Sequence, residues 1–238
     1  MKLFFHYCPS NFSNCYILGT DLWPEEEEQW EVSSLLEPSP LLEPSPHSNP
    51  EPQKEAAFEK EAIIIDPGIM DVSVLNLIED NNYKLRAIFI THDHLHHVQG
   101  LSTIMRIYDA EVYAINPVIN EHRTTLVRDG DILTIGPFKI EVISIPGHSA
   151  DSAVYKIDRL LFTGDTLSAG LIGSTASSYA AATQASALRS RLLSLPGDYT
   201  VLPGHGPPTS LEAERRFNFG LYHFDQQKNR RRTFRVEF

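Results

Sequence analysis

Short apolar runs recur along most of the chain and predict a series of β-strands. Each run is four to seven residues long and is bounded by polar or turn-forming residues, which is typical of strands buried on at least one face. The runs lie at residues 3–7, 15–18, 62–65, 87–90, 112–115, 132–135, 139–145, 153–157, 160–163 and 199–202.

Four segments between these runs space their apolar residues as helices do. They are Asp71–Asn81, His97–Tyr108, Ala180–Leu195 and Ser210–Phe219. Strands and helices alternate early in the chain, and several strands then follow one another with only turns between them. This order predicts an α/β chain built in layers, with helices on the outer faces of its sheets, rather than a pure βαβ array.

One segment, residues 21–61, departs from this pattern. It holds twelve acidic and two basic side chains, seven of the sixteen prolines, and the sequence LLEPSP twice in succession. Proline at this density blocks the hydrogen bonds of helices and sheets, and the charge disfavours collapse. We therefore expect a flexible, acidic, Pro-rich insertion. The strands at Cys15–Leu18 and Ala62–Ile65 should pair as a hairpin, with the insertion at its tip and Asp66 at the other end.

Locating the acidic excess changes what the net charge of -11 implies about partners. Outside residues 21–61 the chain has 19 acidic and 18 basic side chains, so its body is nearly neutral. A neutral body disfavours a nucleic-acid partner. Five cations between Lys228 and Arg235 could contact RNA, but we interpret them as a solvated tail.

Other features of the composition indicate a cytoplasmic protein of one domain, residues 1–238. Its length suits one α/β domain with a real core. No apolar run approaches the roughly 18–20 residues that span a bilayer, and the first residues lack a secretory signal pattern. Only two cysteines occur, Cys8 and Cys15, which are too few for a disulfide framework.

The histidines carry the clearest chemical signal. Four of the ten fall within six residues, in the run THDHLHH at residues 91–97, which follows an apolar strand and leads into a helix. Imidazole is a good ligand for zinc, iron or manganese near neutral pH, and a strand-to-helix loop can turn alternate side chains inward. The run therefore indicates a metal site.

Three later loops add similar residues directly after predicted strands. His148 lies in PGHS at 146–149, Asp165 in TGDT at 163–166, and His205 in PGHG at 203–206. Glycine permits the tight backbone path that brings a ligand close to a metal. Each short motif is weak alone, but four such loops at strand ends strengthen the prediction of one shared site.

In these motifs the chain resembles the metallo-β-lactamase fold superfamily, and within it small glyoxalase II-like (hydroxyacylglutathione hydrolase-like) hydrolases. The resemblance implies an αββα sandwich of two mixed β-sheets with helices on the outer faces. It also implies a metal centre at one edge, with one or two zinc ions, or else iron or manganese. The matching segments are residues 14–18, 64–68, 91–97, 147–149, 163–174 and 202–208.

The ligands that the resemblance implies divide into two sets sharing one carboxylate. The residues at 92, 94 and 148 would hold the first ion, and those at 96, 97 and 205 the second. Asp165 would bridge both ions. By residue, the implied set is His92, His94, His96, His97, His148, Asp165 and His205.

His96 is the main departure from the family pattern, which usually reads H-x-H-x-D-H in this loop. A neutral ring replaces an anionic ligand, which leaves three outcomes open: a binuclear centre with an altered second position, a mononuclear centre, or one selective for another metal. Asp93 is a poor replacement, because it lies between two ligand positions and should point away from the metals. Departures at Ser174 and at Ala150–Asp151 bear on the substrate.

The resemblance implies a metal-dependent hydrolase with a small-molecule substrate. A metal ion lowers the pKa of bound water from about 15.7 toward 7, so hydroxide forms near neutral pH. We expect this hydroxide to attack an ester-like carbonyl, with Asp165 and His96 as candidates to orient it. A thioester of the hydroxyacyl-glutathione type is the first expectation for the substrate.

Two other functions stay open at this point. The first is an iron-dependent enzyme resembling the persulfide dioxygenases of the same fold. The second is a non-catalytic metal-binding protein, in which His96 in place of the usual aspartate has disabled turnover and residues 21–61 recruit a partner.

Overall fold

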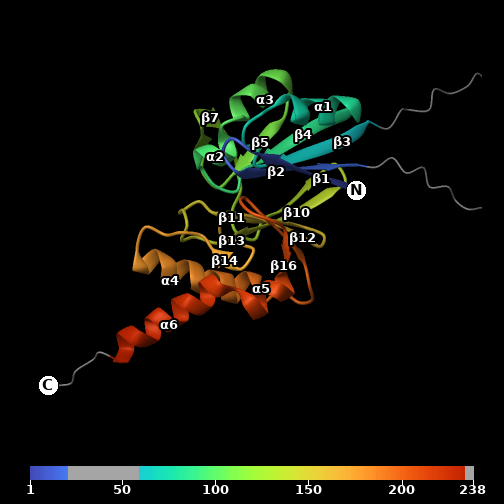
Figure 1. Ribbon diagram of the computed structural model, residues 1–238. Coiled ribbons are helices and arrows are strands. Elements are labelled where there is room, and N and C mark those ends of the chain that lie inside the picture. The colour runs from blue at the N-terminus through green and yellow to red at the C-terminus, as the bar shows by residue number, and fades with distance from the viewer. Residues whose placement is uncertain (21–58, 234–238) are drawn as a thin grey trace, which may run out of the picture.

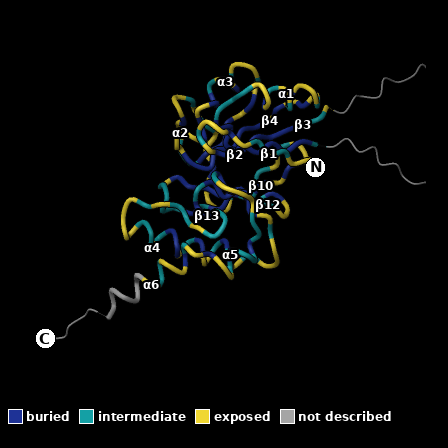
Figure 2. Tube along the Cα trace, in the orientation of Figure 1, coloured by how far each residue is buried: buried dark blue, intermediate teal, exposed yellow. Residues whose placement is uncertain are grey.

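The computed structural model describes residues 1–20 and 59–233, and the side chains up to residue 226. Two six-stranded sheets face one another, and helices cover the outer face of each (Figure 1). The buried residues follow the strands of both sheets (Figure 2). The chain is therefore an αββα sandwich, and the expected fold class is confirmed.

The first sheet is mixed, as expected. Its strand order is β1-β2-β3-β4-β5-β8, with antiparallel pairing from β1 to β3 and parallel pairing from β3 onward. Its strands are β1 (Lys2–Cys8), β2 (Ser13–Gly19), β3 (Lys60–Ile65), β4 (Tyr83–Phe89), β5 (Glu111–Ala114) and β8 (Thr125–Leu126).

The second sheet is also mixed, because β12 and β15 pair in parallel and the other neighbours are antiparallel. Its order is β16-β15-β12-β11-β10-β9. Its strands are β9 (Ile132–Ile135), β10 (Phe138–Ser144), β11 (Ala153–Ile157), β12 (Leu160–Gly164), β15 (Thr200–Pro203) and β16 (Thr209–Ser210). Two small hairpins, which the apolar runs did not predict, are β6 (Val118–Ile119) with β7 (His122–Arg123), and β13 (Leu167–Ser168) with β14 (Leu171–Ile172).

Three apolar clusters hold the layers together. One lies between the two sheets, and the other two lie between each sheet and its helices. Helices α1 (Val72–Asp80), α2 (Leu95–Val98) and α3 (Leu101–Ile107) belong to the first sheet. The second sheet carries α4 (Ser178–Ala187), the π-helical turn η1 (Leu188–Leu192), α5 (Leu211–Phe217) and α6 (Phe219–Thr233).

The expected β2–β3 hairpin is present. Tyr16 pairs with Ile65 at one end, and Gly19 pairs with Ala62 at the other. Asp66 follows the first of these ends, so it lies at the far end of the hairpin from the point where residues 21–58 join. Residues 21–58 of the expected insertion lie outside the described part of the chain, so their flexibility stays a prediction. The end of the insertion at residue 61 is wrong, because Lys60 and Glu61 pair with β4 as the start of β3.

The predicted helix at His97–Tyr108 is wrong in its boundaries, because the structure breaks it into α2 and α3. Gly100 separates them, and its backbone passes so close to Met70 that an added Cβ would lie 2.6 Å from the Met70 nitrogen. The predicted helix at Ala180–Leu195 ends earlier, since α4 passes into η1 after Ala187. None of the helices among the described residues has the length and apolarity that a bilayer crossing requires.

Candidate metal centre

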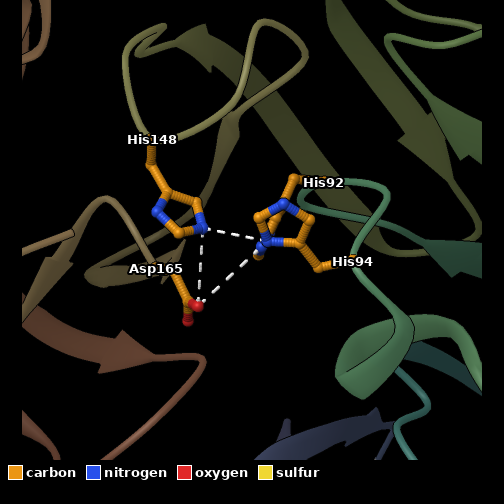
Figure 3. A group of neighbouring side chains, drawn as sticks. All are labelled: His92, His94, His148 and Asp165. Atoms are coloured by element: carbon orange, nitrogen blue, oxygen red, sulfur yellow. Dashed lines mark hydrogen bonds and ion pairs between the residues drawn. The ribbon is translucent and has the colours of Figure 1, made fainter. Parts of the chain in front are cut away.

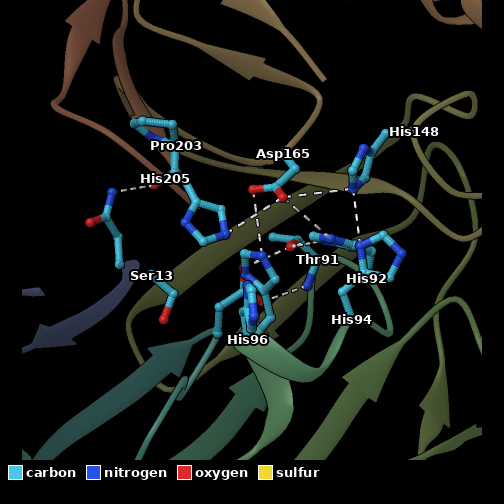
Figure 4. A network of polar contacts seen from close by, with 12 residues as sticks. Ser13, Thr91, His92, His94, His96, His148, Asp165, Pro203 and His205 are labelled. Carbon is cyan, nitrogen blue, oxygen red and sulfur yellow. Dashed lines mark hydrogen bonds and ion pairs between the residues drawn. The ribbon is translucent and has the colours of Figure 1, made fainter. Parts of the chain in front are cut away.

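The four loops that were predicted to carry ligands meet at one edge of the sandwich. The His-rich loop follows β4 of the first sheet, whereas the loops of His148, Asp165 and His205 follow β10, β12 and β15 of the second. Figure 4 shows the first-sheet histidines facing Asp165, His148 and His205 across this edge. Predicted ligands from distant parts of the chain therefore converge, because strand ends of both sheets meet here.

The first group consists of His92, His94, His148 and Asp165, whose ligand atoms all lie within 4.8 Å of one another (Figure 3). The Nε2 atom of His148 is 3.0 Å from Nδ1 of His94 and 3.6 Å from Oδ2 of Asp165. The same Oδ2 lies 3.9 Å from Nε2 of His92. Three imidazoles and a carboxylate thus point at a common position.

The second group consists of His97, Asp165 and His205. Oδ1 of Asp165 lies 3.4 Å from Nε2 of His97, and Oδ2 lies 3.7 Å from Nε2 of His205. Asp165 therefore belongs to both groups, as the family resemblance implied. Six of the seven predicted ligands are brought together in this way, and their role in binding a metal stays a prediction.

His96 is the predicted ligand that the structure does not bring into either group among the described residues. Its side chain is exposed, and its ring centroid is 5.7 Å from that of His205. Asp93 is also exposed and outside both groups, as expected from its place between two ligands. The second group therefore has three converging side chains where the first has four.

Hydrogen bonds fix which nitrogen of most rings faces the centre. Nδ1–H of His148 donates to the Ser174 carbonyl (2.8 Å), and Nδ1–H of His205 donates to the Phe12 carbonyl (2.7 Å). Because a carbonyl only accepts, Nε2 of each of these rings carries the free lone pair.

Asp66 fixes, directly or through Thr91, which ring nitrogen of His97 and His92 faces the centre. Its Oδ2 accepts from Nδ1–H of His97 (3.0 Å) and from the Thr91 hydroxyl (2.6 Å). Since that hydroxyl already donates to Asp66, its oxygen accepts from Nδ1–H of His92 (3.0 Å). Asp66 itself has a φ of 50°, which is unusual for an aspartate. The sequence predicted Asp66 at the hairpin end opposite the insertion but gave it no role. The signal that could have suggested one was its position directly after a buried strand.

The start of β2 holds the loop of His205. Nδ2 of the buried Asn14 donates to the carbonyls of Pro203 and Gly206, at 2.8 Å each. Gly204 leaves no room for a side chain, because an added Cβ would lie 2.4 Å from Cε1 of His97 and 2.6 Å from Oδ1 of Asp165. This is the close approach for which glycine was expected in these loops.

Burial and mutual repulsion set the charge of the ligands. Burial, with His97 nearby, lowers the pKa of His92 to about 2, and burial also lowers the pKa of His94, so both rings are neutral at pH 7. Burial also lowers the pKa of His97, but the attraction of the Asp66 and Asp165 carboxylates is larger and raises this pKa to about 10. For Asp165 burial raises the pKa, yet the nearby His97 and its charge hold the pKa well below its usual range.

The chemistry of these side chains fits a divalent cation. Nε2 of His92, Nε2 of His97 and Oδ1 of Asp165 are buried without a hydrogen-bond partner. Buried polar atoms without partners are costly, and a metal ion would satisfy all three. Imidazole and carboxylate suit zinc, iron and manganese. At His97 an ion would displace the proton that the two carboxylates favour.

The fold and the site together define a class: αββα proteins with a histidine and aspartate cluster, suited to divalent metal, at the edge where two sheets meet. The model of the metallo-beta-lactamase superfamily matches residues 57–205 of the chain. The chain belongs to this superfamily, which is hydrolase-like in its general chemistry.

Curated relatives share parts of this sequence. A hydroxyacylglutathione hydrolase of Buchnera aphidicola subsp. Schizaphis graminum is 35% identical over 113 residues, which are 47% of this chain and 45% of that protein. The chain thus spans less than half the length of that relative. The uncharacterized protein Rv2581c of Mycobacterium tuberculosis is 30% identical over 193 residues, covering 66% of this chain and 85% of that protein.

Solved structures confirm the fold. ETHE1 from Myxococcus xanthus aligns with a TM-score of 0.71 at 22% identity, covering 96% of this chain and 90% of that one. TTHA1623, solved in a di-iron-bound form, aligns with a TM-score of 0.57 at 27% identity, covering 66% of this chain and 88% of that one.

Proposed function

We propose that this protein is a metal-dependent hydrolase that acts on an ester-like carbonyl of a small molecule, in the first place a thioester of the hydroxyacyl-glutathione type. The observation that carries the proposal is the shared carboxylate: Asp165 lies in both ligand groups, which is how a two-metal hydrolytic site is built. The similarity to a hydroxyacylglutathione hydrolase supports the substrate class.

Each residue of the two groups would have its own role in the proposed reaction. His92, His94 and His148 would hold the first ion, His97 and His205 the second, and Asp165 both. Such ions supply a Lewis acid for the carbonyl oxygen and a lowered pKa for water. Asp165 would orient the attacking oxygen, because its Oδ1 lies near His97 and its Oδ2 near histidines of both groups. The exposed His96 is the second candidate for this role.

For the metal we propose zinc, with one or two ions per chain. The donors are imidazole nitrogens and carboxylate oxygen, which zinc accepts readily, but iron and manganese take the same donors. The di-iron form of TTHA1623 supports iron as the alternative. Elemental analysis of protein purified without added metal would give both the identity and the stoichiometry.

A redox function is the second candidate. The fold likeness to ETHE1 gives some support to the iron-dependent persulfide dioxygenase that the sequence left open, although not more than to hydrolysis. Iron in the purified protein together with oxygen uptake on a persulfide substrate, and no thioester cleavage, would favour it over the hydrolase.

Metal removal tests the main proposal. We expect the zinc-loaded protein to hydrolyse at least one member of a panel of thioesters and lactones. Dialysis against a chelator should abolish this activity, because in the proposed mechanism the metal ion lowers the pKa of the attacking water. Restoring zinc should restore the rate. Unchanged hydrolysis by the metal-free protein would overturn the proposal, as would inactivity of the loaded protein on the whole panel.

The His96→Asp variant tests the second metal position. A carboxylate near a divalent ion adds attraction, and about 1.4 kcal/mol of it corresponds to a tenfold change in affinity. We therefore expect the second zinc ion to bind at least about tenfold more tightly, measured by competition with a coloured chelator. His122→Asp is the matched control, since His122 bonds to Ser102 and lies outside both groups. Equal affinity in wild type and His96→Asp would show that position 96 contributes nothing to this ion.

A further inference from the structure

Two ligands of the first group come from different sheets. His94 lies on the loop after β4, and His148 lies on the turn after β10. Their facing nitrogens are 3.0 Å apart (Figure 3). A spacing this short requires the two loops to be held in register, because a metal site loses affinity when its ligands are misplaced by even about 1 Å.

The turn that carries His148 is closed by its own hydrogen bonds. The Ile145 N–H donates to the Ser152 carbonyl (2.9 Å), and the Gly147 N–H donates to the Ser149 carbonyl (3.0 Å). The Ser149 N–H also donates to Oγ of Ser152 (3.2 Å). Whatever is fixed to this turn is therefore fixed relative to His148.

Asp151 lies in this turn and reaches the other loop. Its side chain is buried, with 8% of the residue exposed. Its Oδ2 accepts from the backbone N–H of Asp93, at 2.9 Å, and from Nδ2 of Asn116, also at 2.9 Å. Asp93 is the residue between His92 and His94, so this carboxylate binds the backbone midway between two ligands.

Two other hydrogen bonds between the sheets reach the chain before Asp93. The Ala153 N–H donates to the Thr91 carbonyl (2.8 Å), and the Tyr155 hydroxyl donates to the Ile90 carbonyl (2.7 Å). Both anchor the chain before the first ligand. Among the hydrogen bonds of the described residues, the contact of Asp151 with Asp93 is the one that ties the His148 turn to the backbone between the ligands.

We propose that Asp151 is a positioning residue for the first metal ion: through the Asp93 backbone it holds the His92–His94 loop at the distance from His148 that a shared ion needs. This inference rests on the proposed metal-dependent function. It also gives a role to a position where the chain departs from the common family pattern. The Asp151 carboxylate positions the loop through the hydrogen bonds that it accepts and does not itself bind the ion, since it lies outside both ligand groups.

Two substitutions separate geometry from charge. Asp151→Asn keeps the side-chain length, and because both donors meet the same oxygen, an amide oxygen can accept from both. Asp151→Ala removes the contact entirely. Both are made in a His205→Ala background, which removes a ligand of the second group only, so that binding reports on the first group.

We expect Asp151→Ala to weaken zinc binding about 10- to 100-fold, the usual effect of losing a partner that orients metal ligands. Asp151→Asn should retain nearly the affinity of the background. The visible spectrum of the cobalt-substituted protein should change in Asp151→Ala and stay unchanged in Asp151→Asn. Asp129→Ala is the matched control, because Asp129 accepts from the backbone N–H of Ser144 at the end of β10 but touches neither ligand loop.

The outcomes are distinct. Equal affinity and spectrum in Asp151→Ala and its background would overturn the inference, as would an Asp151→Asn variant as weak as Asp151→Ala, since charge would then be the cause. If Asp151→Ala does not fold by circular dichroism, Asp151→Ser replaces it, because a serine hydroxyl is too short to reach Asp93. If wild type binds no zinc, the proposed function itself fails, whatever the variants do.

Discussion

The double variant His92→Ala, His94→Ala should lose the first metal ion and with it essentially all hydrolysis. These side chains supply two of the four converging donors of the first group, and His148 and Asp165 alone make an incomplete site. Loss of a single residue that hydrogen-bonds to a metal ligand typically lowers metal affinity or activity about 10- to 100-fold. Loss of two direct ligands should therefore lower them at least about 100-fold. The measurement is the rate of thioester hydrolysis together with the metal content of the purified protein.

The control for this double variant is the loss of a histidine outside the metal centre. His122→Ala removes a ring of the same size that is bonded to Ser102, outside both ligand groups. It should retain both the metal and the rate. Full activity in the double variant would refute the assignment of His92 and His94, whereas equal loss in His122→Ala would indicate a general effect on folding.

Asp165→Asn should have the second large effect, because it acts on both ions at once. The amide has the shape of the carboxylate but lacks its charge, and Asp165 is the one carboxylate in either ligand group among the described residues. Two divalent ions would then face imidazoles alone. We expect the metal content per chain to fall below that of wild type, with hydrolysis reduced at least about 100-fold.

Asp93→Asn is the matched control for this charge change. Asp93 lies between two predicted ligands in the sequence, but its side chain is exposed and belongs to neither group. Metal content should therefore stay at the wild-type level in Asp93→Asn. Retention of the full metal content by Asp165→Asn would contradict a shared carboxylate.

Asp165→Asn should also lower the stability of the metal-free protein at neutral pH. The pKa of Asp165 in the folded state lies below its unfolded value, because the attraction of His97 outweighs the effect of burial. The carboxylate therefore stabilises the folded chain at pH values above its unfolded pKa, and this contribution is lost as the pH falls through the folded pKa. Thermal unfolding of metal-free wild type and variant at pH 7 measures it.

Most of the sheet structure was predictable because strand signals are local. The apolar runs at residues 132–135 and 153–157 match β9 and β11 residue for residue. The short strands of the two small hairpins, only two residues each, carry no such signal. The break between α2 and α3 occurs at Gly100, whose backbone passes close to Met70, a tertiary contact that periodicity does not record.

The sequence also predicted most residues of the candidate site, but not the groups that orient them. Residues that follow strands directly, such as His148 and His205, could be placed at one edge. The partners that orient them could not, because a carbonyl such as that of Phe12 has no sequence signature. The position of His96 depends on where the helix begins: α2 begins at Leu95, and its first turn leaves His97 buried and His96 exposed.

The meeting of ligands from both sheets has a consequence for biosynthesis. A ribosome-bound chain that has emerged only as far as α3 already contains His92, His94 and His97, but it lacks His148 and the shared Asp165. Neither ligand group is complete until the second sheet has been synthesised and has docked on the first. Metal capture with the full set of donors would therefore be a late event in maturation, open to the finished protein and closed to its nascent forms.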